Sequence, residues 1–350
     1  MKDSTAKAGI ATTMGLAVPL IMAVSSWEGH DRTGRVHQID FARNMLATCE
    51  PNAILFTGGD NDTFPLWYVQ EVEGFRTDVR VCNLSLLGTD WYIDQMQRQT
   101  YESQALPISL SPDNYYKGIN DHIPYVANPN PQIKAGIDLR EYINLIRKKD
   151  PAIQRMVSNG DMINILPSAN FFFTQNAEQV AQMPFIGEQQ KAMISDRFEW
   201  NFGERDILKN DLVVLDIIAN NQWQRPIYFG GTLPQNQYLG LKEFMQLEGY
   251  AYRLMPFKVE GAKDGFVNSA ILKEKLFTKM LWTNLDNPEV YYDTESFRVP
   301  FITARYAFLR LADEFLREGN KKGAEEVLDK CLAVMPDKSV PYDQLVTNFP

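Results

Sequence analysis

The longest uninterrupted apolar pattern lies near the amino terminus, where residues 8–26 (AGIATTMGLAVPLIMAVSS) carry no charge. A helix of that length spans about 28 Å at about 1.5 Å per residue, close to the apolar thickness of a bilayer. Trp27 follows at the position where an interfacial aromatic residue anchors a membrane helix. The pattern predicts a transmembrane helix with its flank over residues 1–27. A signal peptide cleaved after Ser25 and a buried helix of a soluble protein are the alternatives.

Apolar runs and helical periodicity alternate over residues 28–267, which predicts an α/β domain. A continuous apolar strand at 53–57 is followed by two glycines, a helix that stops at Gly74, and a second strand within 77–87. Strand, helix and strand within about 33 residues are typical of a right-handed βαβ unit with parallel strands. Residues 103–136 have no clear period and are expected to form a long loop region over the sheet.

A strong helix is predicted over residues 208–223, and it leads directly into the apolar strand IYFGG. Two strands, ILFTGG and IYFGG, therefore end in a glycine pair, at 58–59 and at 230–231. Since parallel strands of an open sheet end on the edge where ligands usually bind, neighbouring strands would place both pairs in one crevice. The alternative is that the glycines simply end the strands. Asp216, within the apolar helix face, is either a functional acid or is directed to solvent or a backbone N–H.

Residues 268–350 are predicted to be helical and to resemble a tetratricopeptide repeat. The pattern comprises a first helical face, a glycine stop, a second face and a closing proline, at Phe308, Leu311, Ala312, Phe315, Gly319, Ala324, Leu328, Cys331 and Pro336. A single repeat cannot bury both of its faces. We therefore expect either a neighbouring helix over 269–284 or a native chain that continues beyond residue 350. The whole pattern predicts an open, mainly parallel α/β sheet with flanking helices, preceded by one transmembrane helix and followed by tetratricopeptide-like helices.

Composition excludes several classes of function. The net charge of −9 argues against general nucleic-acid binding, because phosphate backbones require a basic face. The three cysteines cannot all pair and have no metal-ligand spacing, and the H-E-x-x-H and G-x-S-x-G motifs are absent. No cofactor is expected, although a divalent cation remains possible.

The acidic triplet Asp60-Asn61-Asp62 after the first strand has two interpretations. Asp60 and Asp62 can converge on a divalent cation through oxygen ligands, as in transferases that neutralise a diphosphate leaving group. Asp and Asn are also favoured turn residues, and acidic groups are stabilised at a helix N-terminus. In that structural interpretation Asp62 or Thr63 is the N-cap and Pro65 lies in the first turn.

Two other places carry candidate ligand-binding residues. His30, Asp31 and Arg32 lie beside the expected membrane exit, where they could bind a phosphate or carboxylate, or form a salt-bridged linker. Asp90 and Trp91 begin a predicted helix after the second strand, with Asp90 or the preceding threonine as its N-cap.

Three blocks of sequence together resemble a known family, at residues 54–96, 209–229 and 26–35 (SWEGHDRTGR). They are similar to a bacterial multi-pass membrane family, formerly a domain of unknown function. That family is grouped with GT-C-type glycosyltransferases akin to transmembrane protein O-mannosyltransferases that have a tetratricopeptide tail. The resemblance extends from about residue 15 to residue 341, with Gly58 standing where the family commonly has Asn.

The resemblance implies that this chain is the extracytoplasmic, periplasmic portion that follows the last membrane helix. The catalytic acid of such enzymes lies in an early membrane loop and the donor is a lipid-linked sugar, so no catalytic residue is assigned here. The expected role is accessory, namely to bind or orient an acceptor polypeptide or glycan beside the upstream membrane domain and the bilayer. A freestanding membrane-anchored scaffold and a metal-dependent hydrolase using Asp60 and Asp62 are the alternatives.

Overall fold

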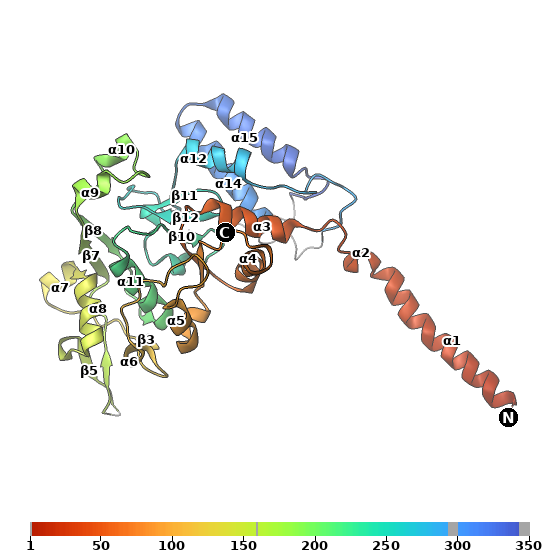
Figure 1. Ribbon diagram of the computed structural model, residues 1–350, viewed down its shortest axis with the longest axis horizontal. Coiled ribbons are helices and arrows are strands. Elements are labelled where there is room, and N and C mark those ends of the chain that lie inside the picture. Colours follow the sequence, from red (N-terminus) through yellow and green to blue (C-terminus); the bar gives the residue numbers. More distant parts are fainter. Residues whose placement is uncertain (1, 159, 293–299, 343–350) are drawn as a thin grey trace.

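A six-stranded mixed sheet forms the centre of the molecule in the computed structural model, which describes residues 2–158, 160–292 and 300–342 (Figure 1). The strand order is β13-β11-β12-β10-β1-β2, and three of the five pairings are parallel. The strands are β1 (Ile54–Thr57), β2 (Arg80–Asn83), β10 (Ile227–Gly230), β11 (Met245–Leu247), β12 (Ala251–Leu254) and β13 (Phe266–Val267). β1, β2, β10 and β12 are buried along their whole length, which explains the continuous apolar runs of β1 and β10.

The predicted βαβ unit is confirmed, because β1 continues through helix α4 (Asp60–Glu73) into β2 and pairs with it in parallel. Gly74 ends α4 with φ of 64°, a left-handed conformation that glycine adopts without steric cost. The predicted N-terminus of α4 was wrong. Gly59 is the N-cap, so the acidic triplet lies within the first turn and Pro65 lies further along inside the helix. The hydroxyl of Thr63 bonds inward to Thr57 instead of capping.

Helices and two-residue to five-residue strands surround the sheet. α3 (His37–Thr48) packs against α4, and α11 (Lys209–Asn221) packs against α8 (Leu139–Lys148). The Asp138 side chain caps α8 as predicted, by accepting a hydrogen bond from the Glu141 N–H. A second sheet has the order β4-β7-β8, and it includes the predicted FFF strand.

The smaller elements of the α/β part complete this arrangement. Its strands outside the central sheet are β3 (His122–Ile123), β4 (Ile137–Asp138), β5 (Gln154–Met156), β6 (Met162–Asn164), β7 (Asn170–Thr174), β8 (Arg197–Asn201) and β9 (Ile207–Leu208). Its short helices are η1 (Leu86–Gly88), α5 (Asp90–Met96), α6 (Pro112–Tyr115), α7 (Pro131–Ala135), η2 (Pro151–Ile153), α9 (Ala177–Ala181), α10 (Glu188–Lys191), η3 (Gln235–Tyr238) and η4 (Lys242–Phe244).

Asp216 holds the long irregular segment 103–136 against α11. It is fully buried, and its carboxylate accepts hydrogen bonds from the backbone N–H groups of Ser109 (2.6 Å) and Leu110 (3.1 Å). The Ser109 hydroxyl and the Asn220 amide also donate to it. Burial raises the pKa of Asp216, and these hydrogen bonds oppose the shift. The structure therefore places Asp216 against backbone N–H groups, one of the three alternatives left open by the sequence.

The C-terminal region contains helices, as predicted, although its described residues 280–292 form turns and irregular structure. α14 (Pro300–Arg317) packs against α15 (Lys321–Val334), and α12 (Ser269–Glu274), followed by η5 (Lys275–Lys279), lies beside α14. The predicted apolar positions are buried except Leu328, which is 44% exposed while the neighbouring Val327 faces the core. Residues beyond 342 lie outside the described part of the chain.

Helix α1 (Lys2–Ser25) projects away from the body and leads through α2 (Trp27–His30) into α3 (Figure 1). Its segment Ser4–Ser25 is long and apolar enough to cross a membrane, and none of its 18-residue window is buried. The helix is therefore not buried against the described part of this chain. Its length and composition fit both a transmembrane helix and a signal sequence. The three cysteines are free and buried.

Replacing Asp216 with Ala should lower the free energy of unfolding by about 2–4 kcal/mol, because the Ser109 and Leu110 N–H groups lose their buried acceptor. Urea unfolding followed by circular dichroism measures the change. Asp113→Ala is the matched control, since Asp113 is an exposed carboxylate of the same segment. An equal effect of both substitutions would contradict the role assigned to Asp216.

Candidate functional site

The carboxyl-end edge of the parallel strands is closed by a polar cluster. β1 and β10 are neighbours, an arrangement that the sequence left open, with Ile54 paired to Ile227. The crevice expected between their glycine pairs is occupied, because the Thr232 hydroxyl donates a hydrogen bond to Asp62 Oδ2. A Cβ at Gly58 would lie 3.2 Å from the Leu233 side chain, so this side chain also fills the edge.

Asp62 is a buried member of this cluster, whereas Asp60 is exposed. Burial raises the pKa of Asp62, and the hydrogen bond from Thr232 opposes the shift. Within the described ranges, no three or more His, Cys, Asp or Glu side chains are grouped so as to hold a metal ion. The two carboxylates of the D-x-D triplet thus have different environments, and the buried one already has a protein partner.

Asp90 and Trp91 lie at the start of α5. Asp90 accepts hydrogen bonds from the Lys117 N–H (2.8 Å) and from Lys209 Nζ (3.1 Å). The Trp91 ring is 57% exposed and packs edge-on against Tyr92. Asp90 therefore ties three segments of the chain together, while Trp91 leaves an aromatic surface open.

His30, Asp31 and Arg32 lie at the end of α2 and in the link to α3. His30 Nδ1 lies 2.9 Å from the Ser26 carbonyl oxygen, and Asp31 accepts a hydrogen bond from the Thr33 N–H at 2.8 Å. Hydrogen bonding to Thr33 lowers the pKa of Asp31. α2 stands apart from α4 and α5 in Figure 1, so the predicted site residues do not form one site.

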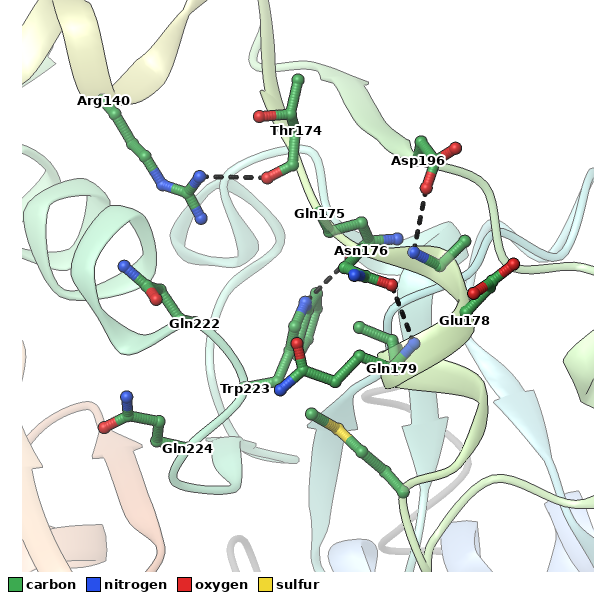
Figure 2. Close-up of a pocket in the computed structure, with 13 residues that line it drawn as sticks. Arg140, Thr174, Gln175, Asn176, Glu178, Gln179, Asp196, Gln222, Trp223 and Gln224 are labelled. Carbon is green, nitrogen blue, oxygen red and sulfur yellow. Dashed lines mark hydrogen bonds between the residues drawn. The ribbon is translucent and has the colours of Figure 1, made fainter.

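A concavity lies elsewhere, between the β7–β8 sheet and the segment that enters β10. It has a volume of about 760 Å³. Polar side chains and one indole dominate its lining, and Figure 2 shows them arranged around a common space: Arg140, Thr174, Gln175, Asn176, Glu178, Gln179, Asp196, Gln222, Trp223 and Gln224. We call it the amide-lined concavity.

Local hydrogen bonds fix the walls of this concavity. Asn176 caps α9 by accepting from the Gln179 N–H at 2.9 Å, and Asp196 accepts from the Ala177 N–H at 2.9 Å. On the opposite wall, Arg140 donates from Nη1 to the Thr174 carbonyl oxygen at 3.0 Å (Figure 2). Its guanidinium also lies over the Phe173 ring, 5.2 Å from the centroid.

Trp223 joins the two walls at the base. Its indole Nε1 donates to Gln175 Oε1 at 2.8 Å, and its ring packs 5.6 Å from the Phe198 ring. Gln222 and Trp223 both have positive φ, 46° and 61°. Positive φ is uncommon for residues other than glycine, and such backbone strain is concentrated at binding and catalytic sites. The strained pair presents Trp223 and its neighbours to the concavity.

Several groups on the walls are available to a ligand. The side-chain amides of Gln179, Gln222 and Gln224 form no hydrogen bond within the portion of the chain that is described. Each carboxamide offers two donors and one acceptor oxygen. Together with an indole surface, they suit an uncharged ligand rich in hydroxyl or amide groups.

Sequence analysis missed this concavity, although its two halves appear as amide-rich runs, QNAEQ at 175–179 and NNQWQ at 220–224. Each run alone is typical of a helix end or a turn. Only the packing of β7 and α9 against the entry to β10 brings them together.

The fold and the projecting helix define a class: an α/β body attached to a helix that is able to cross a membrane. Within that class, residues 38–271 match the family described as TMEM260-associated domain 2. The match spans two thirds of the chain and includes all residues of the amide-lined concavity, and the chain belongs to this family. No curated protein and no solved structure matches it.

Asp62→Asn should alter the pH dependence of stability. The folded state holds the Asp62 proton more tightly than the unfolded chain, since its pKa is raised above the ordinary 3.8. The charged group thus destabilises the fold above its folded pKa, and this penalty disappears below pH 3.8. We expect the change in the free energy of unfolding caused by Asp62→Asn to be more favourable at pH 7 than at pH 3.5. Urea unfolding at both pH values measures this change.

Asp60→Asn is the control for this experiment, because Asp60 is exposed in the same helical turn. If Asp62→Asn destabilised the protein more at pH 7 than at pH 3.5, the Thr232 hydrogen bond and not burial would dominate at this position.

Proposed function

We propose that this chain is an accessory, non-catalytic domain of a membrane glycosyltransferase, and that it binds and orients the acceptor in the amide-lined concavity. The observation that carries the proposal is the composition of that site, in which three carboxamides that have no hydrogen-bond partner among the described residues surround an indole. Planar polar groups beside an aromatic ring match the alternating hydroxyl and C–H surfaces of a sugar. An acceptor glycan therefore fits the concavity better than a polypeptide.

The membrane part of the proposal is supported by α1 and by the family. The exposed apolar helix provides the attachment, and the family name refers to a transmembrane protein. On our proposal the enzyme is of the GT-C type, similar to protein O-mannosyltransferases, and uses a lipid-linked sugar donor. The body then lies on the periplasmic side, and α14 and α15 act as a tetratricopeptide-like hairpin.

The position of the concavity gives this role a geometric consequence. β7, β8 and α9 lie at the end of the body opposite to α1 (Figure 1). One end of an acceptor would bind there, far from the membrane attachment. The other end of the acceptor would then extend to the membrane-embedded catalytic centre. This arrangement suits an extended acceptor and an orienting role.

A freestanding membrane-anchored scaffold is the alternative from another class. The exposed apolar residues of the C-terminal hairpin favour it, since Leu309, Leu316 and Leu332 are each about half exposed. The gene sequence upstream of Met1 separates the two: many hydrophobic segments support the transferase, and their absence supports the scaffold.

A metal-dependent hydrolase using Asp60 and Asp62 is the third candidate. Calorimetric titration with Mn²⁺, Mg²⁺ and Ca²⁺ tests it, with Asp62→Ala as the variant that should lose binding. No heat at millimolar metal would remove this candidate.

The amides of the concavity should contribute directly to acceptor binding. The double substitution Gln179→Ala and Gln224→Ala should weaken binding of mannose-containing oligosaccharides about tenfold or more, because each hydrogen bond contributes about 0.5–1.5 kcal/mol. Calorimetry or ligand-observed NMR measures the affinity. Gln189→Ala on α10, an exposed amide outside the concavity, is the control.

If the chain bound acceptor peptides but not oligosaccharides, the acceptor would be a polypeptide and not a glycan. Binding of neither would overturn the acceptor role. Sugar transfer by the isolated chain from a lipid donor would overturn the accessory role.

The body should be accessible from outside the cytoplasm. Protease added to intact spheroplasts that carry the full-length protein is expected to digest the α/β body while sparing a cytoplasmic control protein. Protection of the body until the membrane is permeabilised would place it on the cytoplasmic side.

A further inference from the structure

A smaller cavity adjoins the amide-lined concavity and is lined by residues 183–185, by the segment that enters β10 and by β12. Its volume is about 240 Å³, and it shares Met183, Trp223 and Gln224 with the concavity (Figure 2). A water molecule takes up about 30 Å³ of the liquid, so the cavity has room for several waters or for a small organic group. The two spaces are therefore neighbouring parts of one site.

The charged side chains in the lining of this smaller cavity are Arg225 and Arg253, and none of its described lining residues is an Asp or Glu. The two arginines are buried, at 7% and 5% exposed. Burial lowers the pKa of Arg225 to about 10, which still leaves its guanidinium charged at neutral pH. The cavity is therefore electropositive.

Arg225 supplies charge to the cavity while its own donors are used elsewhere. Its Nε donates to the Asn52 carbonyl oxygen at 2.9 Å, and its terminal nitrogens donate to the Gln104 carbonyl oxygen at 3.1 Å and to the Ser103 hydroxyl at 3.2 Å. All of these acceptors are uncharged, so they fix the guanidinium in place without neutralising it.

Arg253 on β12 supplies the unused donors. Its guanidinium lies over the Phe185 ring, 4.1 Å from the centroid, and forms no hydrogen bond within the part of the chain that is described. Glu248 pairs with it only at 3.7 Å from Nη1 to Oε1, beyond hydrogen-bond distance. That carboxylate also accepts from the Tyr228 hydroxyl at 2.7 Å and lies 3.4 Å from Lys275 Nζ. A buried guanidinium with unused donors is costly unless something in the cavity accepts from it.

We propose that this cavity is an anion subsite, in which Arg253 binds a carboxylate or phosphate group of the ligand that occupies the amide-lined concavity. A guanidinium offers paired N–H donors that match the oxygens of either group. Arg225 stabilises the same anion through its charge. Water would satisfy the donors of Arg253 but would leave the positive charge of the cavity uncompensated.

This inference rests on the proposed acceptor function, and it adds that the acceptor is an acidic glycan. The amides of Gln179, Gln222 and Gln224 suit the uncharged hydroxyl groups of such a ligand. The arginine cavity lies at one end of these contacts, so an acidic sugar bound there would determine the direction in which the acceptor lies across the site.

The test compares the binding of glucose, glucuronate and glucose 6-phosphate to the whole chain in detergent by ligand-observed NMR. Glucuronate differs from glucose in that a carboxylate replaces the C6 hydroxymethyl group. At least one acidic sugar should bind about tenfold or more tightly than glucose, because hydrogen bonds to charged groups contribute more than neutral ones. Whichever acidic sugar binds more tightly identifies the anion as a carboxylate or a phosphate.

Arg253→Gln should abolish this preference, so that the acidic sugars bind no more tightly than glucose. In this variant Glu248 keeps Lys275 as its cation. Arg43→Gln is the matched control and should preserve the preference, since Arg43 is a partly exposed arginine that pairs with Glu73 outside the cavity.

Equal affinities for the three sugars, or binding of none of them, would overturn the anion subsite. This comparison uses the unsubstituted chain, so it decides the matter even if Arg253→Gln fails to fold. If the three sugars bound equally and mannose-containing oligosaccharides also bound, the acceptor function would stand without the subsite. Binding of an acidic sugar without that of the oligosaccharides would support the subsite and overturn the role proposed for the amides.

Discussion

The parallel pairing of β1 with β10 is the constraint on which the rest of the structure depends. It joins residues 54–56 to 227–229, two segments separated by most of the α/β part. Because α4 follows β1 and α11 precedes β10, one register positions both helices and both edges of the sheet. The strands are buried completely, so a slip of the register would expose apolar surface and bury unpaired backbone groups.

The two edges of the parallel strands have opposite characters. Ligands of open α/β sheets usually bind at the carboxyl ends of the strands, at the point where the strand order reverses. Here that edge is closed by the Asp62–Thr232 hydrogen bond and by Leu233. The amide-lined concavity lies instead at the segment that enters β10. Fold class alone would therefore direct attention to the edge of the sheet opposite to the concavity.

Much of the fold could be predicted from local patterns. The β1–α4–β2 unit, the strand at β10, the Asp138 cap and the buried face of α14 follow from periodicity and capping preferences, which act within a few residues. The start of α4 could not be predicted in this way. The Thr63 hydroxyl forms a hydrogen bond with Thr57 at the edge of the sheet, and Gly59 is the N-cap. Leu328 was predicted to face the core, but its neighbour Val327 is the buried residue. Which of two adjacent residues on a helix is buried depends on how the partner helix packs.

By itself, the sequence determined the order and type of the main elements and the charge-free helix at the amino end. These properties depend on composition and on contacts between residues close in the chain. The tertiary structure alone decided which polar residues meet. It separated Asp62 from Asp60 by burial, and it brought the amides of 175–179 and 220–224 to one indole. The physical reason is that such a site is built from long-range packing, and packing of distant segments leaves no periodic trace in either of them.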